Sequence, residues 1–305
     1  MDISRIKALL KLPLTEIVSI ADRARRDSKG NILELCNIMN AKSGMCGEDC
    51  KFCAQSSRHS SGASAYSLKS KSEMIEAARR AKAMGAHRFD IVTSGNVLTS
   101  DDLRTIAAAM IEIRDDIGID LCASLGRLDE ESLSLLKRSG LSRYHHNIET
   151  SQNFFPKIVT THTFQERVET IKAAKSVGLQ VCSGGIIGMG ESWDDRIDMA
   201  LTLKELDVDS VPINILVPVK GTALEGVKAI SSSDAIRTIA LFRILLKDKI
   251  IKIAAGRESA LKDFQAMAFM AGANGMLIGG YLTIAGRSPE DDRLFAEEIK
   301  EAWAK

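Results

Sequence analysis

Short apolar runs alternate with longer amphipathic segments along the whole chain. Eight of the short runs have the length and composition of strands, and they cover 32–38, 88–94, 119–124, 142–148, 179–186, 210–216, 250–256 and 275–280. Several intervening segments have helical spacing and close on glycine, which predicts helices over 72–86, 129–140, 164–178 and 192–207. A strand and a helix repeated eight times is typical of an α/β protein of the (β/α)₈ TIM-barrel type. A doubly wound open sheet satisfies the same pattern, because periodicity does not report closure.

No stretch rich in Pro, Gly or Ser divides the 305 residues, so a single domain is the simplest organisation. We expect an N-terminal helical cap over 1–30, the barrel over 31–288 and a C-terminal covering helix over 289–305. The gap between the first two strands, 38–88, is much longer than the others. Long loops are usually functional, and a loop after a barrel strand lies at the rim where active sites are built.

Composition narrows the class of ligand. The chain has 41 Lys and Arg against 40 Asp and Glu, so it has no basic field for a phosphate backbone, and we expect no nucleic-acid partner. No apolar stretch approaches the roughly 20 residues that cross a bilayer, so we expect no membrane partner and a cytoplasmic protein that binds small molecules. Six cysteines in such a chain favour metal binding or catalysis over disulfides.

Three of the cysteines lie inside the long gap. Cys46, Cys50 and Cys53 have the spacing C-x₃-C-x₂-C, which allows three thiolates to converge on one metal centre. A structural zinc site needs four ligands, and His59 falls outside the usual spacings. On a cubane iron–sulfur cluster, three fixed ligands leave one iron open to a substrate or cofactor. On spacing alone, a degenerate zinc loop or three buried thiols remains the alternative.

The motif, with Phe52 inside it, resembles the signature of the radical S-adenosylmethionine enzymes, in which the open iron of a [4Fe-4S] cluster binds S-adenosylmethionine. Further blocks are similar, in order, to those of the biotin synthase family: NAKSGMCGEDCKFCAQSS, RYHHNIETS, TTHTFQERVETI, VCSGGIIGMGES, SVPINILVPVKGTALE, AAGRES and MAGANGML. The resemblance implies a sulfurtransferase that converts dethiobiotin to biotin. Because no side-chain acid or base deprotonates an unactivated C–H bond, we expect cofactor radical chemistry and no catalytic side chain.

The other three cysteines, Cys36, Cys122 and Cys182, are isolated in the sequence, and each alone fits a buried core position. They fall on the first, third and fifth predicted strands, and Arg257 lies at the end of the seventh. Alternate strands of a barrel contribute one layer of inward side chains, so the four residues could form a ligand set. The resemblance implies an auxiliary iron–sulfur cluster here, and Cys122, Cys182 and Arg257 match three of its family ligands. A packed core is the alternative.

The remaining auxiliary ligand departs from the family pattern. Asp90 stands where the family has a cysteine, and Cys36 stands where the family has a hydroxyl residue. We therefore expect Cys36 to replace the missing ligand, and the change favours a four-iron cluster with extra sulfide over a [2Fe-2S] cluster. Because a guanidinium has a pKa above about 12, a hydrogen-bonding role for Arg257 remains open.

The resemblance also implies the residues that bind the organic ligands. A side-chain amide has a donor and an acceptor that match a cyclic urea, and a carboxylate can accept hydrogen bonds from two ribose hydroxyls. This chain departs from the family pattern at two of these positions, since His145 replaces an asparagine and Glu149 replaces an aspartate. The residues expected to bind S-adenosylmethionine are Phe52, Ser124, Asn147, Glu149, Arg167 and Ile186. Those expected to bind dethiobiotin are His145, Asn147 and Asn214.

The family further suggests a flavodoxin or ferredoxin as electron donor, and a homodimer. Two other functions stay open at this point. One is a radical S-adenosylmethionine barrel enzyme without sulfur transfer, and the other is a non-catalytic iron–sulfur carrier.

Overall fold

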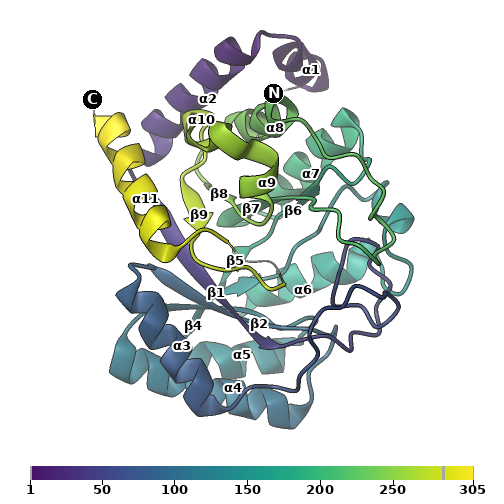
Figure 1. The fold of residues 1–305 in the computed structure, drawn as a ribbon, viewed down its shortest axis with the longest axis vertical. Coiled ribbons are helices and arrows are strands. Elements are labelled where there is room, and N and C mark those ends of the chain that lie inside the picture. The colour runs from purple at the N-terminus through teal and green to yellow at the C-terminus, as the bar shows by residue number, and fades with distance from the viewer. Residues whose placement is uncertain (1, 284–285, 305) are drawn as a thin grey trace.

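The predicted strands form one parallel sheet that closes on itself in the computed structural model, which describes residues 2–283 and 286–304 (Figure 1). The strands are β1 Glu34–Lys42, β2 Arg88–Thr93, β3 Asp120–Ser124, β4 Leu141–His145, β5 Gln180–Cys182, β6 Gly185–Ile187, β7 Ser210–Ile215, β8 Ile250–Ile253 and β9 Gly275–Leu277. Strands β1 to β5 pair in chain order, β6 to β9 do likewise, and the β9–β1 and β5–β7 pairings complete the circle. The closure confirms the (β/α)₈ barrel and excludes the open sheet.

The fifth position of the barrel contains two short strands instead of the single one predicted over 179–186. Cys182 of β5 pairs with Ser210, and Gly185 of β6 pairs with Ile213 on the same strand β7. Between them, the backbone of Gly184 lies so close to β7 that a Cβ there would be 1.9 Å from the carbonyl oxygen of Pro212. β7, β8 and β9 are therefore the sixth, seventh and eighth positions of the barrel.

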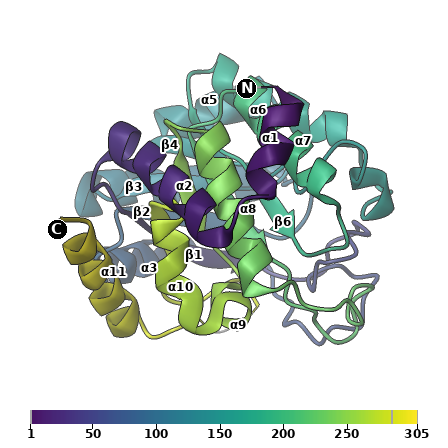
Figure 2. The same cartoon turned by 90° about the horizontal axis from the view of Figure 1, so that it is seen from above.

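Helices follow the strands and cover the barrel from outside (Figures 1 and 2). They are α3 Lys71–Ala83, α4 Ser100–Glu112, α5 Glu130–Arg138, α6 Phe164–Ser176, α7 Trp193–Glu205, α8 Ser232–Leu245, α10 Gln265–Met270 and α11 Pro289–Ala304. Shorter pieces are α9 Arg257–Leu261, the π-helical η1 Ile113–Ile117 and the 3₁₀ turns η2 Phe155–Lys157 and η3 Lys262–Phe264. Capping boxes begin three of the helices, at Ser70, Thr163 and Ser192.

The two ends of the chain pack against the same side of the barrel. Helices α1 Ile3–Leu10 and α2 Leu14–Lys29 lie outside α8 (Figure 2). The buried guanidinium of Arg25 on α2 lies 4.0 Å from the centre of the Trp303 ring on α11, which ties the two ends together. Within the described residues, no helix combines the length and apolar character that a membrane span requires.

Candidate active site

A cavity of about 380 Å³ opens inside the barrel and extends to the loops that follow its strands. All but one of the residues predicted from the sequence to bind a metal or an organic ligand line this single cavity. They are Cys36, Cys46, Cys50, Phe52, Cys53, Cys122, Ser124, His145, Asn147, Glu149, Arg167, Cys182, Ile186 and Asn214.

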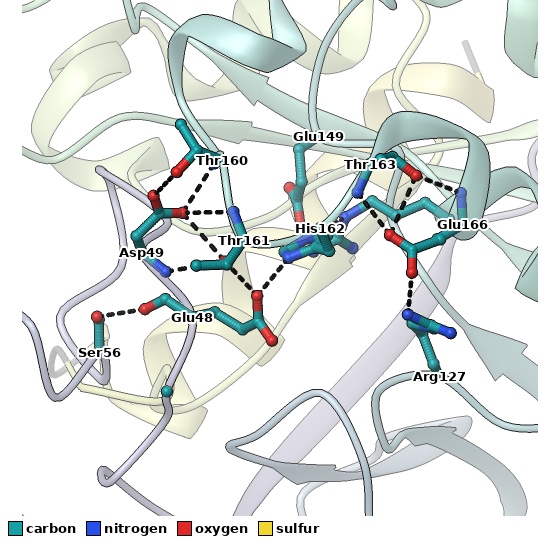
Figure 3. Close-up of polar contacts among 12 residues, drawn as sticks. Glu48, Asp49, Ser56, Arg127, Glu149, Thr160, Thr161, His162, Thr163 and Glu166 are labelled. Atoms are coloured by element: carbon teal, nitrogen blue, oxygen red, sulfur yellow. Dashed lines mark hydrogen bonds and ion pairs between the residues drawn. The ribbon is translucent and has the colours of Figure 1, made fainter.

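The loop that carries Cys46, Cys50 and Cys53 is fixed by two acidic side chains (Figure 3). Asp49 accepts hydrogen bonds from the backbone N–H groups of Thr160 and Thr161, at 2.9 and 3.2 Å, and from the Thr160 hydroxyl. Partial burial opposes ionisation of this carboxylate, but these donors outweigh it and hold the pKa of Asp49 well below its usual range. Glu48 accepts from the Thr161 hydroxyl and lies 2.6 Å from Nδ1 of His162. We call Glu48, Asp49 and residues 160–162 the loop clamp.

The loop clamp continues into the cavity through His162. Nε of Arg167 can only donate, and it lies 3.2 Å from Nε2 of His162, so this nitrogen accepts and Nδ1 carries the proton that is donated to Glu48. Arg167 also donates to the backbone carbonyl of Asn147 at 2.9 Å and lies 3.7 Å from the Glu149 carboxylate. A chain of hydrogen bonds thus joins the cysteine loop to Arg167, and an ion pair joins Arg167 to the Glu149 carboxylate at the rim.

Glu149 is held in an unusual backbone conformation. Its φ is +67°, which non-glycine residues rarely adopt, and its carbonyl accepts from the N–H of Ile186 at 2.8 Å. A Cβ at Gly185 would be 2.3 Å from that same carbonyl oxygen, so only glycine permits the approach. The strained turn keeps the Glu149 side chain on the cavity wall, and such strain is typical of functional sites.

Halfway down the cavity, a second polar chain crosses from β2 to β4. Asp90 Oδ2 lies 3.0 Å from Nδ1 of His145, and Nε2 of His145 lies 3.0 Å from Oδ1 of Asn147. Burial opposes the charged imidazole, but Cys182, Asp90 and Asn147 together raise the pKa of His145 to about 9. His145 is therefore a cation that donates through both nitrogens.

The floor of the cavity contains the other three cysteines and a lysine. Cys36, Cys122 and Cys182 come from β1, β3 and β5, the first, third and fifth positions, and Lys252 comes from β8, the seventh. The Lys252 ammonium lies 2.8 Å from the Cys36 sulfur. These four residues of alternate strands form the inward layer that a (β/α)₈ barrel builds. We call them the floor layer.

Charged groups surround the floor layer. Glu34, two residues before Cys36 on the same face of β1, is 3.2 Å from Lys252, 2.7 Å from Arg143 and 3.0 Å from Arg88. Burial would raise the pKa of Glu34, but the three cations hold it well below its usual range. Burial also raises the pKa of the Cys36 thiol to about 11, against the influence of Lys252. Arg88 also lies 3.2 Å from the carboxylate of Asp120. Three cations and two carboxylates thus leave an excess of one positive charge beside three thiols.

Comparison with known proteins identifies the architecture. The model of the radical SAM superfamily matches residues 42–203, and that of the Biotin and Thiamin Synthesis associated domain matches residues 212–300. A biotin synthase from Thermotoga neapolitana is 54% identical over 88% of this chain and 96% of its own length. One from Thermotoga petrophila is 49% identical over 97% and 98%.

The chain belongs to the biotin synthase family. It is accordingly a radical S-adenosylmethionine sulfurtransferase that converts dethiobiotin to biotin, and its cofactors include a [4Fe-4S] cluster and S-adenosylmethionine. Solved structures agree at the level of the fold. Methylornithine synthase superposes with a TM-score of 0.84 at 21% identity, over 96% of this chain and 91% of its own. A maturase of the [FeFe]-hydrogenase gives 0.82 at 16%, over 96% and 70%.

Within this member of the biotin synthase family, the prediction for Arg257 is wrong. Strand β8 ends at Ile253, earlier than the predicted 250–256, because the chain turns at Gly256, whose φ is +83° and where a Cβ would be 2.0 Å from a carbonyl oxygen of β7. Arg257 begins helix α9, and its guanidinium donates to Asp292 at 2.5 Å, to Gln265 at 2.8 Å and to Tyr281 at 3.1 Å. In the described part of the chain it does not line the cavity.

The sequence analysis missed Lys252, Glu34 and Arg143. A signal for each was present, since all three are charged residues inside predicted strands. Lys252 interrupts the apolar run IIKI, and Glu34 shares the parity of Cys36. A charged side chain in a strand that is buried on both faces needs a polar partner. We would therefore expect it to face other polar residues inside the barrel.

Proposed function

We propose that the loop cysteines and the floor layer hold two separate iron–sulfur clusters at opposite ends of one cavity. The observation that carries this proposal is the convergence of all six cysteines on that cavity, three from a loop and three from alternate strands. In a sulfur insertion the two clusters have different tasks. When bound, the loop cluster supplies the electron that cleaves S-adenosylmethionine, and the auxiliary cluster supplies the sulfur.

The floor layer suits a thiolate-bound cluster. Buried neighbouring thiols with raised pKa values, such as Cys36 and Cys122, ionise when a metal displaces their protons. The resulting anions would then face the cations Lys252, Arg143 and Arg88, which offset their charge. We propose Cys36, Cys122 and Cys182 as the ligands, with Lys252 donating a hydrogen bond to the Cys36 sulfur.

The excess of positive charge also bears on the type of auxiliary cluster. A four-iron cluster with extra sulfide carries more sulfide than a [2Fe-2S] cluster, and sulfide is anionic. We propose the four-iron form, because Lys252, Arg143 and Arg88 provide three cations against the two carboxylates of Glu34 and Asp120.

At the rim, we propose that Arg167 binds the methionine carboxylate of S-adenosylmethionine and that Glu149 accepts from its ribose hydroxyls. Phe52, Ser124 and Ile186 border the same ligand, and the loop clamp holds Arg167 in place through His162. Deeper in the cavity, Asn147 and Asn214 bind the ureido ring of dethiobiotin, and His145 borders the ring while its two nitrogens hold Asp90 and Asn147. The substrate is thereby oriented between the rim and the floor, with water excluded by burial.

We further propose that a flavodoxin or a ferredoxin delivers the electron, that the chain acts as a homodimer, and that it works in the cytoplasm. The loop cysteines Cys46 and Cys53 are half-buried at the rim, which supports electron entry from a docked protein. Six free thiols agree with a reducing compartment.

Anaerobic iron and sulfide analysis with Mössbauer spectroscopy tests the two-cluster proposal. We expect the wild-type chain to show two cluster signals, Cys36→Ala to lose the auxiliary signal alone, and Cys46→Ala to lose the loop signal alone. Each variant serves as the control for the other, because each leaves one cysteine set intact. An auxiliary signal that survives unchanged in Cys36→Ala contradicts the assignment of this ligand.

A further inference from the structure

Within the residues that the structure describes, one carboxylate oxygen of Asp90 has no hydrogen-bond partner. The residue lies on β2, directly across from Cys122 on β3, and its side chain is 8% exposed on the cavity wall. Oδ2 accepts from His145, whereas the buried Oδ1 has no hydrogen-bond partner among the described residues. An unsatisfied buried acceptor is costly, so the geometry implies a donor that enters the cavity.

The side-chain amides of Asn147 and Asn214 have more unused hydrogen-bond donors than unused acceptors. Oδ1 of Asn147 already accepts from His145 and from the N–H of Gly184, each at 3.0 Å. Oδ1 of Asn214 accepts from the N–H of Ala255 at 3.2 Å, and its Nδ2 donates to Gly185 at 3.2 Å. Each amide nitrogen carries two protons and uses one, so each retains one free N–H.

The ureido ring needs both kinds of partner. A cyclic urea presents one carbonyl acceptor and two N–H donors. The free N–H groups of Asn147 and Asn214 match the carbonyl, but Asn147 has no acceptor left for a ring N–H. Oδ1 of Asp90 is close by, because His145 forms hydrogen bonds to both Asp90 and Asn147.

We propose that Oδ1 of Asp90 accepts a hydrogen bond from one ring N–H of dethiobiotin, while His145 holds Oδ2 and so aims the carboxylate. Asp90 is then a specificity-determining residue that selects a urea N–H over an ether-type oxygen at the same place. The inference rests on the proposed placement of dethiobiotin beside Asn147 and Asn214, and adds a contact to it. It also gives a role to the residue that stands in place of the family cysteine.

Two other unpartnered buried atoms on the wall, His146 Nε2 and Thr93 Oγ1, are weaker candidates. Each residue has the opposite parity to its inward neighbours, since His146 follows His145 and Thr93 follows Val92. Neither is hydrogen-bonded to a residue of the proposed ureido site. Asp90 alone combines a free acceptor with a direct link to Asn147 through His145.

Ligand analogues test the contact in the wild-type protein. Equilibrium dialysis with the anaerobically reconstituted chain and S-adenosylmethionine would measure binding of dethiobiotin and of two cyclic carbamates, each with one ring N–H replaced by oxygen. We expect one carbamate to bind about 10- to 100-fold more weakly than dethiobiotin, because an ether-type oxygen facing a carboxylate loses a charge-assisted hydrogen bond and gains repulsion. Equal binding of all three compounds overturns the proposal while leaving the dethiobiotin site in place.

Variants then locate the acceptor. Asp90→Ala should lose dethiobiotin affinity by a similar factor and should no longer distinguish dethiobiotin from the disfavoured carbamate. Asp90→Asn should do no better, because an amide that keeps its oxygen on His145 turns its N–H₂ toward the ligand. Asp101→Asn removes a carboxylate that is 88% exposed on the outer helix α4, and should behave as wild type. Discrimination that persists in Asp90→Ala assigns the acceptor elsewhere, and a wild-type chain that binds no dethiobiotin overturns the ureido site as well.

Discussion

The two cysteine sets reach one cavity by different structural means. Cys46, Cys50 and Cys53 lie within eight consecutive positions of one loop, and the loop clamp ties that loop to residues 160–162. Cys36, Cys122 and Cys182 lie far apart in the sequence and come together only because alternate strands of a closed barrel face inward. A local set is recognisable from spacing alone, whereas a distributed set is recognisable only once the barrel is assumed.

The surroundings of the two sets differ as well. At the rim, the cation Arg167 faces two carboxylates on the cavity wall, Glu149 directly and Glu48 through His162, so the balance is negative. At the floor, three cations face the two carboxylates of Glu34 and Asp120, and the balance is positive. The difference indicates that the floor is built to accept more negative charge than the rim. It agrees with the proposed sulfide-rich cluster at the floor and with S-adenosylmethionine at the rim, since the sulfonium and ammonium groups of that ligand outnumber its one carboxylate.

The largest effect should come from removing the positive charge of the floor layer. Lys252→Met leaves Glu34 with fewer partners beside three thiols, and breaking a buried charge network costs about 3–5 kcal/mol. We expect loss of the auxiliary iron and a fall in biotin formation of a hundredfold or more. Formation of 5′-deoxyadenosine from S-adenosylmethionine, measured in the same assay, should continue.

Lys252→Arg is the matched control, because it retains the charge and the donor. It should keep most of the auxiliary iron. Equal iron content in Lys252→Met and wild type would show that the floor does not need this cation.

Substitution of the buried Arg257 should affect the stability of the protein and leave the auxiliary cluster unchanged, because Arg257 lies outside the cavity. Its pair with Asp292 is fully buried, so Arg257→Met should lower the free energy of unfolding by about 3–5 kcal/mol. The loss leaves the Asp292 carboxylate with the more distant Arg287, at 3.9 Å, and the N–H of Gly279 as its partners. Denaturant unfolding would measure this effect, and Mössbauer spectra of the folded fraction should match those of the wild type. A specific loss of the auxiliary signal in Arg257→Met would show that Arg257 is a ligand of the auxiliary cluster after all.

Lys252 and Arg257 also show how much of the site can be predicted from the sequence. Eight periodic runs predicted the barrel correctly, and alternate strands predicted which cysteines share a layer. The residue from the seventh position was assigned wrongly, because strand β8 ends at Ile253 and the turn at Gly256 depends on contact with β7. Periodicity does not contain that long-range contact. The same reason explains why the interruption between β5 and β6 at Gly184 was not predicted.

The smallest effect should separate the two hydrogen bonds of His162 and so test how the rim is held. In His162→Asn the amide replaces Nδ1, which preserves donation to Glu48 and releases Arg167. In His162→Gln the amide oxygen reaches toward the place of Nε2, which preserves acceptance from Arg167 and releases Glu48. A hydrogen bond to a charged group is worth about 1.5–3 kcal/mol. We therefore expect His162→Asn to raise the KM for S-adenosylmethionine roughly tenfold with kcat little changed.

His162→Gln should instead keep the KM near that of wild type and lose loop-cluster iron faster to a chelator, because Glu48 no longer holds the cysteine loop through the imidazole. The chelation rate and the KM thus report different bonds of one residue. If the two variants behave alike in both measurements, His162 merely fills space, and the loop clamp and Arg167 are not connected through it. If they differ in the expected directions, the local cysteine set depends on contacts from another part of the chain, as the distributed set depends on the barrel.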